Sequence, residues 1–582
     1  MAIARRWAVL GLSAVPTIFC AWLLVLLARA DGWAPLDSVR LILSTMCVFW
    51  LMWGAASGLL GLFMRGAPPD RAGPSRSRTA ILMPIYNEDP PSTFARVAAI
   101  SNRLTALEAH AAFDIFILSD SQQIESAARE ALWLERLLTD CAAREQIFYR
   151  RRVKNTGRKA GNVEDFVRKS GGAYDYALVL DADSLMDAEA ILTMVRRMDE
   201  SPSLGLLQTL PSIVHAQSIF GRAMQFATHL YNPVYSRGAA MLQGGEGPYW
   251  GHNAIFRIGA FAQSCGLPEL AGRPPFGGHI LSHDYVEAAL LARGGYDVRL
   301  DPTIAGSYEE GPDNILDFAK RDQRWCQGNL QHSRVVMAPQ LKVWNRVTLL
   351  QGIFSYLMPS VWLALLVISI IAADLLSHSY YYYFHATRST EWAGWLLVGI
   401  VVSVLVVPKF IIAFDAIAGG RVGGAAASLR LLAGVLAEIV LSTLVAPLIL
   451  MFQVRAVSRV VFGIDGGWPA SNRTSSEVSL AEAWAGSWWI TCAGASGLAV
   501  VIAFASSLAT WTLPVALPMI FAPVLIALTS QQSPALSRLW RVPEETAPSP
   551  VLLEWQKVHD GWTGPAAVTV ENFSGGAANV LG

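Results

Sequence analysis

The stretch Tyr176–Ser184, which reads Tyr-Ala-Leu-Val-Leu-Asp-Ala-Asp-Ser, decides the fold. Its apolar half is typical of a strand buried on both faces of a sheet, and its acids follow at the carboxyl end, where open α/β sheets bind ligands. Because side chains alternate along a strand, we expect Asp181 and Asp183 to point to the same side, where they can share one divalent cation and the diphosphate it holds. A capped turn without a ligand explains the same residues, so other motifs have to decide.

The composition indicates a membrane protein. Of the 582 residues, 53% are hydrophobic and only 15% are charged, which is too apolar for a soluble enzyme of this size. The formal net charge is zero, so the basic footprint typical of nucleic-acid binding is missing. The six cysteines form no C-x-x-C pair, and neither a disulfide framework nor a zinc site is indicated.

Two apolar runs predict an N-terminal membrane region over residues 1–65 with two transmembrane helices. The first run, residues 7–27, is long enough to span the membrane, although Ala-Arg-Ala at 28–30 resembles the cleavage site of a signal peptide. The second run, residues 41–63, leads into a basic-leaning linker around Arg71, which the positive-inside rule places in the cytoplasm. We therefore expect the next domain to be cytoplasmic.

Residues 76–312 are predicted to form that cytoplasmic domain, with an α/β fold. The runs 79–86 and 113–118 indicate two more strands, and each is followed by an acid. If these strands lie beside the one that precedes the two aspartates, their ends bring Glu88 and Asp120 into the same crevice. The sequence has no G-x-G-x-x-G motif, so a dinucleotide is not expected.

A basic loop, residues 151–162, lies between the second and third strands and contains five basic residues and two glycines. Asn162 is predicted to cap a helix there, so that cations and backbone amides meet at a helix N-terminus. Such a place binds phosphate, whereas a solvated surface loop is the competing interpretation.

Two later segments carry aromatic and acidic residues. In the glycine-rich segment 243–253, Tyr249 and Trp250 either stack on sugar rings or pack in the core. Asp284 falls in the first turn of a predicted helix, where the helix dipole is expected to lower the pKa of its carboxyl group. That suits a base that is ionised at neutral pH.

The chain then returns to the membrane. Residues 313–340 predict amphipathic helices at the membrane interface, where Trp325 could serve as a simple anchor. Residues 345–530 predict a C-terminal membrane region with four spans, namely 347–373, 392–413, 484–507 and 511–528. Segment 430–462 is long and apolar but carries several charges; it is assigned to the interface rather than counted as a span. The tail, 533–582, is rich in proline, glycine and polar residues and is predicted to be flexible and cytoplasmic.

Several of these motifs resemble the processive family 2 glycosyltransferases, which include cellulose and hyaluronan synthases. The motifs are Asp120, Asp181-Ala-Asp183, Ser282-His-Asp284 and Arg321-x-x-Arg324-Trp325. A closer resemblance, over about residues 40–530, is to the glucosyltransferase H branch, which acts in osmoregulated periplasmic glucan synthesis; it is carried by Gly157–Asn162, Trp250–Asn253, Ser282–Val286 and Arg324–Asn329. Arg321 stands where most of the family has glutamine, and Ser282-His283 where most has Thr-Glu. Both departures favour this branch.

The resemblance implies a type A glycosyltransferase domain, with a Rossmann-like nucleotide-binding sheet, inserted in an α-helical transmembrane bundle. It implies UDP-glucose as donor and Mg²⁺ or Mn²⁺ as cofactor, with Asp183 as metal ligand and Asp284 as catalytic base. The nucleotide sugar would be bound by Glu88, Asp120, Lys159, Asp181, Arg321 and Arg324, and the acceptor by Trp325, Trp250 and His252. Residues 463–477, with Trp468 and Arg473, would form a gating loop, although an ordinary turn with an interfacial tryptophan fits that composition equally well.

The expected function is that of a multi-pass enzyme of the bacterial inner membrane that polymerises UDP-glucose, with inversion, into a β-1,2-glucan. The growing glucan would pass through the lipid bilayer toward the periplasm, and acyl carrier protein and periplasmic glucan-modifying proteins are candidate partners. Another family 2 synthase, making a cellulose-, curdlan- or hyaluronan-like polymer, is the nearest alternative. A transporter or scaffold with a degenerate transferase domain is the alternative from a different class.

Overall fold

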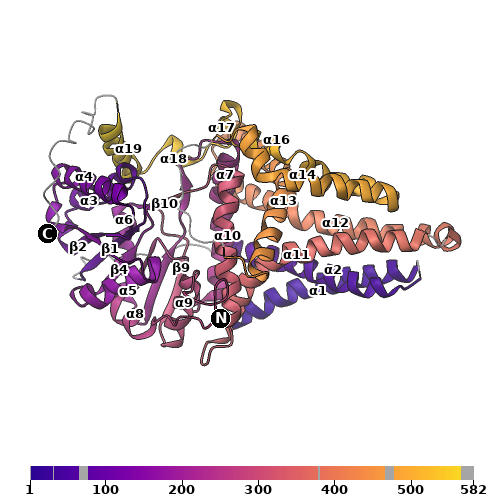
Figure 1. The fold of residues 1–582 in the computed structure, drawn as a ribbon, viewed down its shortest axis with the longest axis horizontal. Coiled ribbons are helices and arrows are strands. Elements are labelled where there is room, and N and C mark those ends of the chain that lie inside the picture. The colour runs from indigo at the N-terminus through magenta and orange to yellow at the C-terminus, as the bar shows by residue number, and fades with distance from the viewer. Residues whose placement is uncertain (1, 31, 64–76, 378–379, 466–476, 565–582) are drawn as a thin grey trace.

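The computed structural model describes residues 2–30, 32–63, 77–377, 380–465 and 477–564. These residues form two parts (Figure 1): an α/β domain, and a group of long helices that project from one side of it. Helices α7 and α10 run across the junction between the two parts. The predicted fold class, an α/β domain inserted between membrane-type helices, is confirmed.

The α/β domain is built on a seven-stranded sheet in the order β3-β2-β1-β4-β8-β6-β9. Strand β8 runs antiparallel to β4 and β6, and the other neighbours are parallel. A smaller sheet has the order β5-β10-β7. The strands are β1 (Thr79–Ile85), β2 (Phe113–Ser119), β3 (Ile147–Arg151), β4 (Tyr176–Val179), β5 (Leu185–Met186), β6 (Leu204–Thr209), β7 (Ser212–Val214), β8 (Ala254–Arg257), β9 (Asp297–Asp301) and β10 (Ser307–Glu310).

Helices cover both faces of the large sheet. Along β1, Ile81 and Met83 pack with one layer of helices, while Ala80 and Leu82 pack with the other, and all four are fully buried. This burial on both faces explains why the predicted strands are continuous apolar runs. The first layer contains α3 (Pro90–Ala106), α4 (Ile124–Asp140) and α6 (Ala188–Glu200); the second contains α5 (Arg158–Ser170), α8 (Ile258–Ser264) and α9 (His283–Arg293).

The three predicted strands are β1, β2 and β4, and they are neighbours in the order β2-β1-β4. They are parallel, so their carboxyl ends meet at one edge of the sheet. The junction helices α7 (Ile219–Gln243) and α10 (Ile315–Gln331) follow later in the chain. Helix α10 lies within the predicted amphipathic segment 313–340 and begins after its cap residue, Asn314.

Six helices in the described part of the chain are long and apolar enough to cross a membrane. The number is up to seven if α15 and α16, which are bent by 60° relative to each other, count as one broken span. The six helices are α1 (Ala2–Ala30), α2 (Pro35–Leu60), α11 (Val343–Ser377), α12 (Tyr380–Ala418), α13 (Gly424–Val461) and α14 (Leu480–Phe504). The bent pair consists of α15 (Ala509–Ile520) and α16 (Ala522–Thr529). The prediction differs in two respects: it assigned the segment that forms α13 to the interface, and it counted residues 511–528 as one span, which the structure breaks into α15 and α16.

Two points of α13 (Gly424–Val461), one near its middle and one in its second half, contact the junction helices. Near the middle, Glu438 accepts a hydrogen bond from Tyr231 of α7 at 3.2 Å. Fifteen residues later, Gln453 donates to Asp322 of α10 at 3.0 Å. These two points are separated by about 22 Å along the helix, and a helix that ran straight across the membrane would carry one of them away from the junction. The contacts therefore agree with an interface position, which stays a prediction.

The prediction of a flexible tail is wrong for residues 533–563. This segment forms three helices, α17 (Pro534–Leu539), α18 (Pro543–Thr546) and α19 (Pro550–Thr563). Apolar residues of α19, among them Val551 and Trp562, are buried in the same core as Ile81. They recur at helical spacing, a signal that the proline-rich composition of the tail conceals. Residues 565–582 lie outside the described part.

The position of α13 can be tested by labelling single cysteines placed at its two ends. We expect Gly423→Cys and Ile464→Cys, both exposed positions, to be shielded from an impermeant thiol reagent outside intact spheroplasts and labelled after permeabilisation. Trp33→Cys, between α1 and α2, should be labelled from outside. The parent protein without an added cysteine gives the background. Labelling of only one end of α13 from outside would make α13 a span.

Candidate active site

One cavity of about 930 Å³ lies at the carboxyl ends of the central strands and extends to helices α10 and α11. It brings together all the predicted site residues that the structure describes. They are Glu88, Asp120, Lys159, Asp181, Asp183, Trp250, His252, Asp284, Arg321, Arg324 and Trp325. The predicted gating-loop residues Trp468 and Arg473 lie outside the described part.

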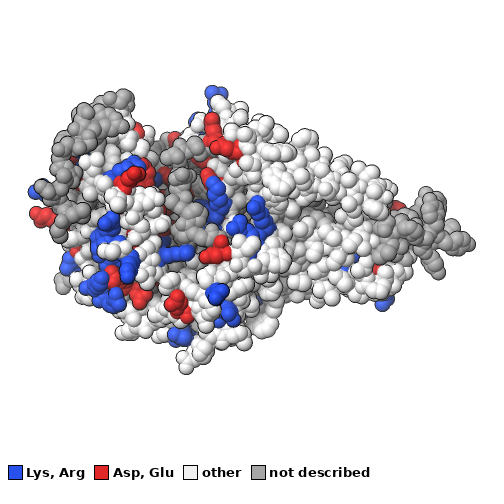
Figure 2. Space-filling view, in the orientation of Figure 1, with Lys and Arg blue, Asp and Glu red and all other residues white. Residues whose placement is uncertain are grey.

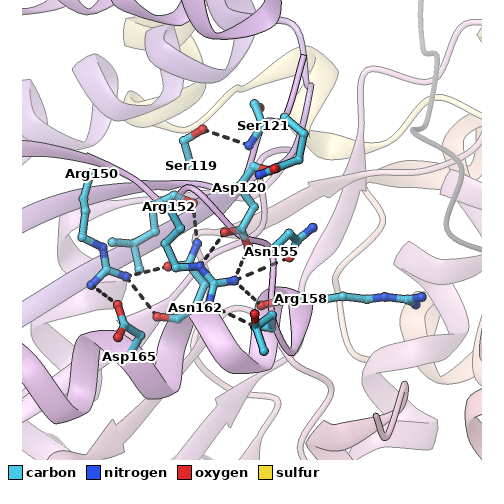
Figure 3. A network of polar contacts seen from close by, with 12 residues as sticks. Ser119, Asp120, Ser121, Arg150, Arg152, Asn155, Arg158, Asn162 and Asp165 are labelled. Carbon is cyan, nitrogen blue, oxygen red and sulfur yellow. Dashed lines mark hydrogen bonds and ion pairs between the residues drawn. The ribbon is translucent and has the colours of Figure 1, made fainter. Parts of the chain in front are cut away.

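Asp120 directly follows β2 and anchors the basic loop (Figure 3). Its carboxylate is buried and accepts two hydrogen bonds from Arg152, at 2.6 Å from Nε and 2.8 Å from Nη2. The same guanidinium donates to the backbone carbonyls of Thr156 and Arg158, each at 3.0 Å. Asp120 therefore acts first as the anchor that fixes this loop, and Arg158 extends from the loop to the cavity.

The predicted helix cap in this loop is wrong. Helix α5 begins at Arg158, and its cap is Gly157, with a φ of 68° in the left-handed region. Asn162 lies inside the helix, buried, where it donates to the carbonyl of Leu118 at 3.0 Å. A Cβ on Gly161 would lie 2.2 Å from the carbonyl oxygen of Thr156, so the tight turn requires a glycine there.

A buried acid beneath Asp120 was not predicted. Glu130 of α4 is fully buried and accepts hydrogen bonds from Ser119 at 2.7 Å, from Ser121 at 2.5 Å and from Tyr149 at 2.8 Å. These bonds fix the backbone on both sides of Asp120. In the sequence, the signal is a single charge on the face of the amphipathic helix α4 that also carries Trp133, Leu134 and Leu137, which pack against the core.

The two aspartates do not lie on a strand. Strand β4 ends at Val179, and Asp181–Ser184 forms a turn in which the Ser184 amide donates to the Asp181 carbonyl at 2.9 Å. The Ser184 hydroxyl accepts the Asp181 N–H at 3.0 Å. Strand alternation, on which the prediction relied, therefore does not set the directions of these two side chains, because the backbone has already turned. Both carboxylates nevertheless line the cavity, and Asp181 pairs with Lys159.

The residues at this turn fit a divalent cation only together with a substrate. Among the described residues, no group of three or more His, Cys, Asp or Glu side chains forms a complete metal site. Mg²⁺ and Mn²⁺ are hard cations that take carboxylate oxygens, and Mg²⁺ usually takes one or two of them together with phosphates and water. The carboxylate of Asp183 at the cavity wall is such a donor, so the group fits if a diphosphate supplies further ligands.

Asp284 lies in the first turn of α9, as predicted, but the direction expected for its pKa is wrong. Burial in the cleft raises the pKa of this carboxyl above its ordinary value, and the carboxylate of Glu287 adds to the rise. The neighbouring His283 opposes the rise without overcoming it. Loss of solvent therefore outweighs the helix N-terminus here. A raised pKa makes Asp284 a stronger base once it is ionised.

Two histidine–acid pairs stand beside these groups. His283 lies 3.1 Å from Glu287, and His252 lies 3.5 Å from Glu309. Burial opposes protonation of both histidines, but nearby carboxylates raise the pKa of each, Glu287 at His283 and Asp181 followed by Glu309 at His252. Glu309 was not predicted, although it belongs to an acid pair that ends β10 just before a glycine.

The far end of the cavity is lined by α10 and α11. The guanidinium of Arg321 lies 4.7 Å from the ring centre of Trp325, which is 47% exposed. The ring stands at the cavity wall, where it offers an exposed face for stacking. Beyond it the cavity reaches small and polar residues of α11, among them Gly352 and Ser355.

The chain matches two family models. Residues 80–264 match the model described as glycosyl transferase family 2, and residues 176–407 match the model described as glycosyl transferase family group 2. Among solved structures, a mannosyltransferase from Pyrobaculum calidifontis, in complex with GDP-Man and Mn²⁺, is similar with a TM-score of 0.41 and 15% identity, covering 64% of this chain and 99% of its own.

Curated relatives match over almost the whole chain, and each is named glucans biosynthesis glucosyltransferase H. The protein from Cereibacter sphaeroides is 48% identical over 96% of this chain and 95% of its own length. The protein from Xylella fastidiosa is 37% identical over 94% of this chain and 89% of its own length. The protein from Caulobacter vibrioides is 38% identical over 94% and 86%, respectively. With this identity along its length, the chain belongs to the glucosyltransferase H branch of the family 2 glycosyltransferases.

Proposed function

We propose that this protein is a processive, inverting glucosyltransferase of the bacterial inner membrane. It polymerises UDP-glucose into the linear β-1,2-glucan backbone of osmoregulated periplasmic glucans and passes the chain toward the periplasm. The observation that carries the proposal is the single cavity, which joins acids and cations at the strand ends to Asp284, to the exposed ring of Trp325 and then to α11. The names of the relatives support glucan synthesis.

The strand-end part of the cavity holds the donor. Lys159, Arg321 and Arg324 place cations around the position of a diphosphate, and Asp183 would hold the Mg²⁺ or Mn²⁺ that accompanies it. When bound, this cation neutralises part of the charge that develops on the leaving diphosphate. The ion pair of Lys159 with Asp181 keeps the ammonium group at this wall before the donor arrives.

The reaction joins a donor and an acceptor that bind at the two ends of the cavity. Asp284 accepts the proton of the acceptor hydroxyl, whose oxygen forms a bond to C1 of glucose while the bond from C1 to the diphosphate oxygen breaks. UDP departs with that oxygen and its electron pair. Attack from the face opposite the leaving group inverts the configuration at C1, so an α-linked donor gives a β-linked product.

The acceptor lies on the α10 side. Trp325 supplies a face for the terminal glucose, and Trp250 and His252 line the wall beside it. Gly352 and Ser355 of α11 continue the cavity toward the membrane helices, which gives an extended polymer a direction to leave. The catalytic domain is placed on the cytoplasmic side, as the basic linker after α2 indicates.

The function is tested with purified enzyme, labelled UDP-glucose and Mg²⁺. We expect a labelled polymer that is insensitive to cellulase and to β-1,3-glucanase, and methylation analysis that finds 2-linked glucose. Omitting the divalent cation should abolish incorporation. A polymer with 3-linked or 4-linked glucose would make the protein a different family 2 synthase, and no release of UDP would favour a scaffold.

Two substitutions should separate the donor end from the acceptor end. Asp183→Asn should lower kcat by at least about 100-fold and weaken UDP binding in Mn²⁺, because the cation loses its protein ligand. Asp284→Asn should lower kcat by about 10²- to 10⁴-fold while UDP affinity stays near that of the wild type, because this acid faces the acceptor. Calorimetric UDP binding and initial rates measure both. Near-normal polymerisation by Asp284→Asn would refute the base assignment.

The pH dependence follows from the raised pKa of Asp284. The base works only when it is ionised. Because its pKa is raised, the carboxylate becomes protonated at a pH above the ordinary aspartate value of 3.8. As the pH is lowered, kcat/KM should therefore begin to decline before the pH reaches that value. The residual activity of Asp284→Asn should lack this decline. A flat wild-type profile down to the pH of unfolding would contradict the assignment.

A further inference from the structure

The C-terminal segment 533–563 joins the membrane helices to the catalytic domain. At the membrane end, Trp540 is 2% exposed and its Nε1 donates to the carbonyl of Gly434 in α13 at 3.0 Å. In the middle, Glu545 accepts hydrogen bonds from Arg222 and Gln225 of α7. The segment then ends in α19, which lies on α3 of the catalytic domain (Figure 1).

Helix α19 is docked as part of the core rather than as a surface addition. Val551, Leu552 and Trp562 are each at most 6% exposed and belong to the core of the first helix layer. Burying each such side chain contributes roughly 1.5–3 kcal/mol, enough together to hold a helix of four turns in place. The Val551 amide also donates to Asp187 at 3.2 Å, just beyond the turn of the two aspartates.

Arg96 of α3 connects α19 to that turn. It is only 4% exposed, and its Nη1 donates to the carbonyl of Ala182, between Asp181 and Asp183, at 3.1 Å. Its other branch pairs with Glu310. A buried guanidinium stays where its partners are, because an unpaired buried charge is costly. The fork of Arg96 thus fixes the peptide that carries Asp183.

Trp555 of α19 covers the guanidinium. The Arg96 carbon Cζ lies 5.5 Å from the centre of the Trp555 ring, and the ring of His215 stacks on Trp555 at 4.5 Å. The indole Nε1 donates to the Ser92 carbonyl at 3.4 Å, which fixes the plane of the ring. A cation over an aromatic face is held there and shielded from water.

We propose that Arg96 is a positioning residue for the aspartate turn, and that Trp555 of the C-terminal segment holds it in place. The segment thereby sets how well Asp183 presents its carboxylate to the cation and diphosphate. This inference rests on the metal assignment of Asp183 in the proposed function. It gives the tail, which the sequence predicted to be flexible, a place in donor binding.

The test is a comparison of UDP binding with and without the cation. UDP is titrated calorimetrically into the full-length enzyme, once in Mn²⁺ and once in EDTA. The Kd in EDTA divided by the Kd in Mn²⁺ measures what the cation contributes to UDP binding. We expect Arg96→Lys and Trp555→Ala to reduce this ratio by about tenfold, with the Kd in EDTA unchanged. Lysine keeps the charge but cannot bond to both Ala182 and Glu310 through one planar fork.

Two matched variants control for the helix itself. Lys557→Ala removes an exposed side chain of α19 and should leave the ratio unchanged. Trp555→Phe keeps an aromatic face over Arg96 and should restore most of the ratio. Thermal unfolding and gel filtration establish that each variant is folded. If Arg96→Lys does not fold, Trp555→Ala, in which Arg96 is intact, decides alone.

The outcomes separate this inference from the function. A wild-type ratio in the folded Arg96 and Trp555 variants would overturn the inference, and so would equal weakening of UDP in Mn²⁺ and EDTA, since that indicates general damage to the nucleotide pocket. A wild-type enzyme without any effect of Mn²⁺ would overturn it together with the Asp183 assignment. A wild-type enzyme that shows the expected ratio but makes no glucan would overturn only the proposed function.

Discussion

The ion pair between Lys159 and Asp181 is the contact on which the candidate site depends. It joins the start of α5 to the turn after β4, and the same ammonium group donates to the carbonyl of Gly251 at 2.7 Å. Three segments that are distant in the sequence thus meet at one charge. Figure 2 shows lysine and arginine side chains on the catalytic domain and near its junction with the long helices, while the surface of those helices is largely uncharged. Charged side chains therefore gather on the catalytic domain and at the junction, whereas the long helices present the apolar surface that a membrane requires.

Local patterns predicted much of this arrangement. The strands β1, β2 and β4 and the acids after them could be read from the sequence, because an apolar run and the residue that ends it are neighbours in the chain. The partners of those acids could not be predicted from the sequence. Arg152 on Asp120 and Arg96 on Ala182 depend on which distant segments meet, and spacing does not reveal that. The pKa of Asp284 was misjudged for a related reason: the helix dipole is local, whereas burial is set by the whole cleft.

The same difference between local patterns and contacts of distant segments explains why the structure of the tail was not predicted. Its composition predicted flexibility, but a few apolar residues at helical spacing are enough when they are buried in the core of the catalytic domain. The contacts of α13 with α7 and α10, and of Trp540 with α13, tie the catalytic domain to the membrane part at separate points. Such ties hold the part of the cavity lined by α10 beside α11.

The central claim is that donor chemistry and polymer exit share one cavity, and a photo-crosslink tests it most directly. A photoreactive amino acid at Ser355 of α11, at the far end of the cavity, would be activated during synthesis from labelled UDP-glucose. The account predicts labelled glucan attached at Ser355, and none at Trp395, an exposed position on α12. Active polymerisation with no crosslink at Ser355, or with equal crosslinking at both positions, would contradict it.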